Sequence, residues 1–82
     1  MKVKLFYRTQ REVAIAVNNI INAYWEEVIT EEELINNLEA LYINNEKKIV
    51  KNNDFTTVLK QQCGKRRLEI VDRVIHMQQD LK

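Results

Sequence analysis

The sequence predicts an all-α protein, a small domain of three to four helices that takes up the whole chain, residues 1–82. The chain has no proline and one glycine, whereas an all-β chain needs turn residues every few positions. Two segments also combine a helix start signal with apolar residues at helical spacing. We expect an extended arm over 1–8 and a helical region over 9–82, in which an antiparallel helical hairpin precedes a long C-terminal helix.

The first residues alternate between apolar and charged side chains, which is the pattern of a β-strand. Val3, Leu5 and Tyr7 fall on one side of this segment. A single strand has no partner within an otherwise helical chain. The segment therefore either pairs with its copy in a dimer or lies on the helices as an extended arm, and we favour the arm.

Two helix starts have the spacing of a capping box, in which a threonine hydroxyl accepts from an amide and a glutamate reaches back. Thr9 and Glu12 begin a helix predicted over 10–27, and Thr30 and Glu33 begin a second one. Three glutamates in the first turn of the second helix suit the positive end of its dipole. The connection between the two helices is short, so we expect antiparallel neighbours.

The end of the second helix is harder to place, because asparagine side chains compete with helical backbone bonding. Asn44 and Asn45 either cap a short helix that begins at Glu46, or lie within a second helix that continues through Ile49. Two more asparagines follow, and we expect Asp54 after them to cap a third helix.

Gly64 is the expected joint between the third helix and the last one. Glycine is the commonest residue just past a helix C-terminus, and the cations that follow suit the negative end of the preceding helix. One unbroken helix over 55–79 is the alternative, since an internal glycine costs only about 1 kcal/mol relative to alanine. The apolar stripes of all these helices predict a core of Val13, Ala16, Val17, Ile20, Tyr24, Leu34, Leu38, Leu41, Phe55, Val58, Leu59, Ile70, Val71, Val74 and Ile75.

Charge is unevenly distributed along the chain, although the net charge is only +1. Residues 26–46 hold seven glutamates and no lysine or arginine, and the segments on both sides are basic. The simpler interpretation is that these segments neutralise one another within the fold or across a dimer. An external anion bound by the basic segments is the alternative.

The sequence contains no catalytic motif, and we expect a protein that is not an enzyme, without catalytic, metal or cofactor-binding residues. Cys63 and His76 are the single cysteine and histidine, and their spacing fits no nucleophile–base template. Cys63 lies on an apolar stripe, which favours a small buried side chain. His76 shares a helix face with Glu69 and Asp72, as in some metal sites, but ordinary solvated faces show the same pattern.

Self-association is the function that we favour: a non-enzymatic protein-interaction module whose partner is a second copy, as a homodimer, or another protein. A helical domain of 82 residues without a disulfide or a metal has only a modest core. Amphipathic and adaptable side chains suit an interface. The candidate interface residues are Leu5, Tyr7, Trp25, Tyr42 and Met77.

A small nucleic-acid-binding regulator is the alternative. The segment 55–75 can be aligned with a helix-turn-helix, with Gly64 in the turn and a longer helix after it. The candidate nucleic-acid contacts are then Lys65, Arg66, Arg67 and Arg73. The alignment is imperfect, because Lys60 and Arg73 stand where the motif carries a small and an apolar residue.

The segments LFYRTQRE, DFTTVLKQ and CGKRRLEIV resemble those of a family of small uncharacterised all-helical bacterial proteins of unassigned function. The resemblance covers most of the chain and implies an intracellular bacterial protein, with no catalytic residues to carry over. No secretory signal and no apolar run near the roughly 20 residues of a membrane span are visible. With one cysteine, these features predict a cytoplasmic protein that does not enter a membrane.

Overall fold

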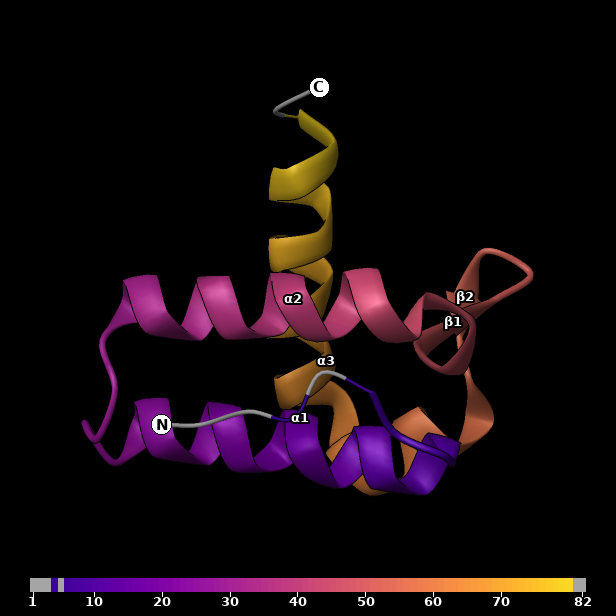
Figure 1. Cartoon of the computed structure of the whole chain (residues 1–82), viewed down its shortest axis with the longest axis horizontal. Coiled ribbons are helices and arrows are strands. Elements are labelled where there is room, and N and C mark those ends of the chain that lie inside the picture. Colours follow the sequence, from indigo (N-terminus) through magenta and orange to yellow (C-terminus); the bar gives the residue numbers. More distant parts are fainter. Residues whose placement is uncertain (1–3, 5, 81–82) are drawn as a thin grey trace.

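Three helices make up most of the computed structural model, which describes residues 4 and 6–80, with side chains as far as residue 77. α1 (Gln10–Trp25) and α2 (Glu31–Ile49) lie side by side, and α3 (Thr57–Asp80) crosses behind both (Figure 1). Between α2 and α3 the chain forms two short strands, β1 (Val50–Lys51) and β2 (Asp54–Phe55). The described chain is therefore mostly helical, and the predicted all-α class is confirmed.

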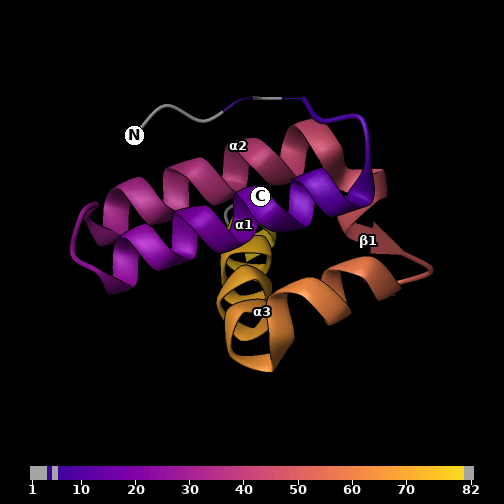
Figure 2. The same cartoon turned by 90° about the horizontal axis from the view of Figure 1, so that it is seen from below.

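The elements form layers, which are clearest when the molecule is turned (Figure 2). The described part of the N-terminal arm lies on one side of α1 and α2, and α3 lies on the other. Because α1 packs against both other helices, it is buried over a wider arc than one stripe. Ala14 and Ala23 are buried in addition to the predicted stripe of α1, and Trp25 is not.

The core differs from the predicted one mainly at its edges. Most of the predicted residues are buried, but Tyr24, Phe55, Val58 and Ile70 are only partly buried. The buried apolar residues outside the predicted core, Ala14 and Ala23 apart, are Ile21, Ile29 and Ile49. Cys63 is also buried, as its place on an apolar stripe predicted.

Both helix starts are capped by the predicted threonines. Thr30 and Glu33 form the full reciprocal capping box, with the Thr30 amide donating to the Glu33 carboxylate at 3.2 Å. At Thr9 the hydroxyl accepts from the amide of Glu12 at 3.1 Å and donates to its carboxylate. Each cap satisfies an amide that the first turn of its helix leaves free.

α1 ends in a Schellman motif, in which the chain reverses through one residue with left-handed backbone. Glu27 has a φ of 61° and donates its amide to the Tyr24 carbonyl, and Val28 donates to the Ala23 carbonyl at 2.8 Å. The residue in the place of Val28 commonly packs back on the helix. Val28 is instead 70% exposed.

Asn45 bends α2 and holds the arm. Its backbone is non-helical, with a φ of −134°, so α2 continues through Ile49 but is kinked there. The Asn45 side chain is buried, donates to the Leu41 carbonyl at 3.0 Å and accepts from the amide of Tyr7 at 3.2 Å. The described part of the arm therefore lies on its own α2, while Leu5 lies outside the described residues.

The segment after α2 is a β-hairpin, so the prediction that Asp54 caps the third helix is wrong. Asn52 and Asn53 have φ values of 56° and 65°, which a two-residue type I′ turn requires. Asp54 therefore pairs with Lys51 in the antiparallel ladder. Thr56 caps α3 instead, because its hydroxyl accepts from the amide of Leu59 at 3.3 Å.

Candidate functional site

Gly64 breaks α3 into two helical halves, 57–63 and 65–80, as the sequence predicted. Its φ of 78° and ψ of 167° lie in a region that glycine alone adopts readily. The break leaves carbonyls at the end of the first half without helical partners. Asn18 of α1 donates to the Gln62 carbonyl at 2.9 Å, and Arg67 donates to the Cys63 carbonyl at 3.2 Å.

Arg67 is fixed at this joint by three kinds of contact. Its guanidinium donates to the side-chain oxygen of Asn22, at 2.8 Å from Nη2 and 3.3 Å from Nε, and it lies 5.1 Å from the centre of the Trp25 ring. Asn22 was missed by the sequence analysis, because nothing local connects it to a residue 45 positions later. These contacts hold the Arg67 guanidinium against α1.

Arg66 and Arg73 lie on the same side of α3 as Trp25. The guanidinium of Arg66 is 5.7 Å from the Trp25 ring, which remains 43% exposed. Trp25, Arg66, Ile70, Arg73 and Glu69 line a shallow hollow of about 170 Å³. Met77 is 44% exposed two helical turns further along α3, and it is not among the residues that line this hollow. We call Trp25, Arg66, Glu69, Ile70 and Arg73 the tryptophan patch.

Exposed glutamates follow Trp25 directly, in the turn between α1 and α2. We call Glu26, Glu27, Glu31 and Glu32 the acidic turn. The ion pairs of the described residues are Lys60 with Asp54 and His76 with Asp72. Within the described part of the chain, therefore, no glutamate of residues 26–46 forms an ion pair with the basic segments.

Of the four predicted nucleic-acid contacts, Arg66, Arg67 and Arg73 lie around Trp25. Lys65 lines a neighbouring open cleft of about 450 Å³ together with Phe55 and Leu68. Arg66 and Arg73 belong to the tryptophan patch, and Arg67 is held at the joint.

The predicted interface residues are also distributed over several surfaces. Trp25 lies in the tryptophan patch, and Met77 is exposed two helical turns beyond Ile70 on α3. Tyr7 and Tyr42 are half-buried against the core, and the ammonium of Lys4 lies 5.5 Å from the centre of the Tyr7 ring.

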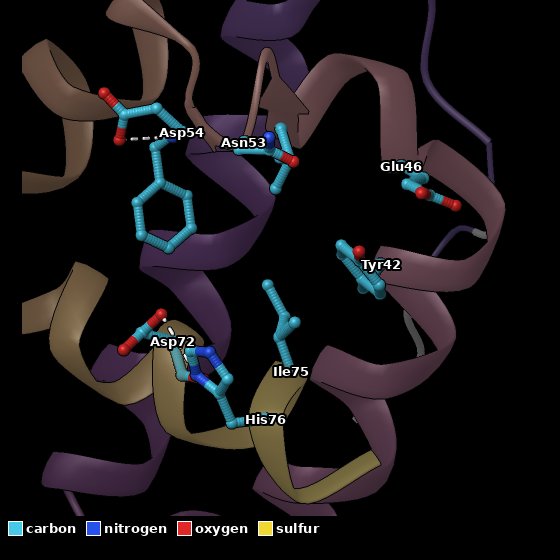
Figure 3. A pocket seen from close by; sticks show the side chains of 9 residues that line it. Tyr42, Glu46, Asn53, Asp54, Asp72, Ile75 and His76 are labelled. Carbon is cyan, nitrogen blue, oxygen red and sulfur yellow. Dashed lines mark hydrogen bonds and ion pairs between the residues drawn. The ribbon is translucent and has the colours of Figure 1, made fainter. Parts of the chain in front are cut away.

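A third cavity, of about 390 Å³, lies between α2, the hairpin and the second half of α3 (Figure 3). Tyr42 and Glu46 line one side, and Asp72 lies opposite, with its carboxylate 3.2 Å from Nδ1 of His76. Burial, and secondarily the charge of Glu46, raises the pKa of Tyr42. Asp54 is the third carboxylate of the lining, and a hydrogen bond from Lys60 lowers its pKa. Two of the three carboxylates have partners within the chain, Asp54 with Lys60 and Asp72 with His76.

The single thiol is not arranged for nucleophilic chemistry. Cys63 is buried, and its Sγ lies 3.7 Å from the carbonyl oxygen of Ala14. Burial raises the pKa of Cys63 to about 11, against a smaller opposite effect of Arg67, so the thiol stays protonated at neutral pH.

The described residues include no group of three or more histidine, cysteine, aspartate or glutamate side chains placed to hold a metal ion. In the same part of the chain, none of the helices combines the length and the apolar character that crossing a membrane requires.

Comparison with known proteins identifies a family but no characterised relative. Neither the curated proteins nor the solved structures include one that matches this chain. The model of one protein family, described as a conserved hypothetical protein, matches residues 4–76, from the arm through α3. The match covers both capped helix starts, the hairpin and the Gly64 joint. The chain therefore belongs to this family of conserved hypothetical proteins.

Proposed function

We propose that this protein is a small, non-enzymatic interaction module that associates with a second copy of itself. The observation that carries the proposal is Trp25, a large aromatic ring left 43% exposed between two arginines. Tryptophan and arginine are enriched at the centres of protein interfaces. The bonds of Arg67 to Asn22 and to the Cys63 carbonyl hold this surface in place, so little freedom is lost when a partner binds.

The distribution of charge supports a second copy as the partner. The acidic turn and the arginines of the tryptophan patch are not paired with each other within the described chain. Each copy therefore offers both signs of charge to another copy, and a net charge of +1 produces little repulsion between copies. The buried, protonated thiol of Cys63 supports a non-enzymatic role, and we infer a cytoplasmic module in which this thiol stays reduced.

Sedimentation equilibrium up to millimolar protein tests the proposal. We expect the average mass to rise towards twice the 9.8 kDa of one chain. Trp25→Ala should shift the association to higher concentration, because it removes the centre of the surface. Ile43→Ala is the matched control, since Ile43 is 59% exposed on α2 outside the patch. A wild-type protein that stays monomeric throughout this range contradicts the proposal.

A nucleic-acid-binding regulator is the second candidate, favoured by the exposed Trp25 beside Arg66 and Arg73. Aromatic rings stack on bases and arginines contact phosphates. Two features count against it. Gly64 alone separates the halves of α3, whereas a helix-turn-helix has a turn of three or four residues. Exposed Glu69 and Asp72 also lie between the two arginines along the helix, where they would repel phosphate.

Electrophoretic mobility with duplex and single-stranded DNA at about 50 mM salt tests this candidate. Arg66→Ala with Arg73→Ala should weaken any binding and flatten its salt dependence, and both variants avoid the structural Arg67. Lys47→Ala with Lys51→Ala is a control that removes the same charge from the far end of α2 and the hairpin. Absence of a shift with the wild-type protein excludes the candidate.

A further inference from the structure

We propose that two copies pair about a two-fold axis beside Trp25, with the acidic turn of each copy lying on the tryptophan patch of the other. This inference rests on the proposed self-association and specifies the surface that carries it. Besides Trp25, an interface residue predicted from the sequence, this surface includes the acidic turn and Val28.

Trp25 stands between two oppositely charged surfaces. It is the last residue of α1, and Glu26 and Glu27 follow it at once. On its other side the guanidinium groups of Arg66 and Arg67 lie 5.7 and 5.1 Å from its ring. A two-fold interface is formed by the same surface on both copies. If the acidic turn of one copy contacts the patch of its partner, the acidic turn of the partner contacts the patch of the first copy. A surface that carries glutamates on one side of its centre and Arg66 and Arg73 on the other is therefore complementary to itself, and exposed Glu69 in the hollow offsets part of the positive charge.

Apolar side chains around Trp25 supply the centre that such an interface needs. Val28, three residues after Trp25, is 70% exposed although its motif usually covers that position. Ile70 lies in the hollow with Trp25. An aromatic and an aliphatic side chain at the centre with charged residues around them match the common anatomy of protein interfaces.

The extent of the molecular surface indicates that both parts must take part. A specific interface buries about 800 Å² on each partner. That is about one seventh of the 5798 Å² that this chain exposes. The shallow hollow beside Trp25 is too small to provide it alone, so the turn between α1 and α2 has to contribute together with α3.

Charge reversal tests the pairing. The basic-side variant carries Arg66→Glu and Arg73→Glu, and the acidic-side variant carries Glu26→Lys and Glu31→Lys. Each variant alone should associate about tenfold more weakly or worse, because like charges then face each other across the axis. An equimolar mixture should regain association, because a mixed dimer restores both opposite-charge contacts. Lys47→Glu with Lys51→Glu, which changes the net charge as much as the basic-side variant, should associate like the wild type.

The measurement is sedimentation equilibrium of the full chain, with circular dichroism to show that each variant is folded. If the wild type associates and both reversed variants do so equally well, the proposed surface is wrong while self-association stands. If both variants are monomeric and their mixture is too, the reciprocal contact is wrong. A wild-type protein that is monomeric overturns the self-association itself and this surface with it.

Discussion

Gly64 and Arg67 show how two residues share the work at a break in a helix. Gly64 supplies a backbone conformation that other residues avoid, and Arg67 bonds one of the carbonyls that the break leaves free. A cation near the start of a helix is unfavourable, but Arg67 also lies at the negative end of the preceding half. Its contacts with Asn22 and Trp25 then connect the joint to α1.

Replacing Gly64 by alanine should lower the free energy of unfolding by about 1–3 kcal/mol, because the new side chain strains a backbone with a φ of 78°. Steric overlap contributes nothing, since no atom lies within 4 Å of the position of the added carbon. Chemical denaturation measures the change. Gln61→Ala, at an exposed helical position, should stay within about 0.5 kcal/mol of the wild type. An equal effect of the two substitutions would show that the joint carries no strain.

Cys63 should react with iodoacetamide far more slowly in the native protein than after unfolding, because its thiol is buried and protonated. Its pKa is raised from 9.0 to about 11 in the folded state. The stabilisation from the buried neutral thiol is fully present below pH 9, the pKa of the unfolded state. It is lost as the pH rises from there towards the folded-state pKa of about 11. The difference in unfolding free energy between the wild type and Cys63→Ala should therefore narrow over that range. Fast labelling of the native protein at neutral pH would contradict the burial of the thiol.

At the scale of elements, asparagine serves three different purposes in this chain. Asn45 kinks α2 and binds the arm, Asn18 and Asn22 of α1 bind the joint in α3, and Asn52 and Asn53 form the hairpin turn. The short amide side chain both bonds to nearby backbone and tolerates left-handed backbone angles. The same residue type thus ends, bends or connects elements according to its place.

Asn53→Gly should raise the free energy of unfolding by about 0.5–1 kcal/mol, because glycine suits a φ of 65° better than any side chain does. The same substitution at Asn19, which is exposed within α1, should lower it by about 0.5 kcal/mol, since glycine weakens helix interiors. Thermal or urea unfolding of the two variants shows whether each substitution raises or lowers the free energy of unfolding. Destabilisation by both would mean that the type I′ turn contributes nothing to folding.

The helices could be predicted from the sequence because their signals are local. Thr30 and Glu33 form a capping box within four residues, and Gly64 stands alone after an apolar stripe. The hairpin was missed because Asn52 and Asn53 indicate a helix stop as readily as a type I′ turn.

The candidate site could be predicted only in part. Trp25 and the cations after Gly64 were each identified, but their contact joins positions more than 40 residues apart. No local pattern reports such a contact. For the same reason Asn22, which holds Arg67, and the second buried side of α1 were not foreseen.

At the scale of the whole molecule, the glutamates of the acidic turn form no ion pair with the cations near Trp25 within the described residues. The acidic turn lies at one end of the helical pair, and the described cations near it contact an aromatic ring instead of a carboxylate. Such an arrangement favours association at low ionic strength, since opposite charges on two copies attract over about 10 Å in 0.1 M salt.

Self-association should therefore weaken as salt is raised from about 0.05 to 0.5 M, because added salt shortens the screening length and weakens the attraction between exposed opposite charges. Light scattering across this series gives the apparent dissociation constant. Arg66→Gln with Arg73→Gln should flatten the salt dependence, whereas Lys47→Gln with Lys51→Gln should leave it intact. A wild-type dissociation constant that does not change with salt would show that charge plays no part.

The joint at Gly64 also sets an order of events for a chain that is being made. Its partners on α1 precede it by 44 positions in the bond from Asn18 to Gln62 and by 45 in the bond between Arg67 and Asn22. The face of α1 that packs against α3 therefore stays uncovered until α3 has been synthesised. Contacts this distant in sequence slow folding relative to a bundle built from neighbouring helices. Until they form, the nascent chain exposes the apolar side of α1, which makes this stage the one most open to aggregation.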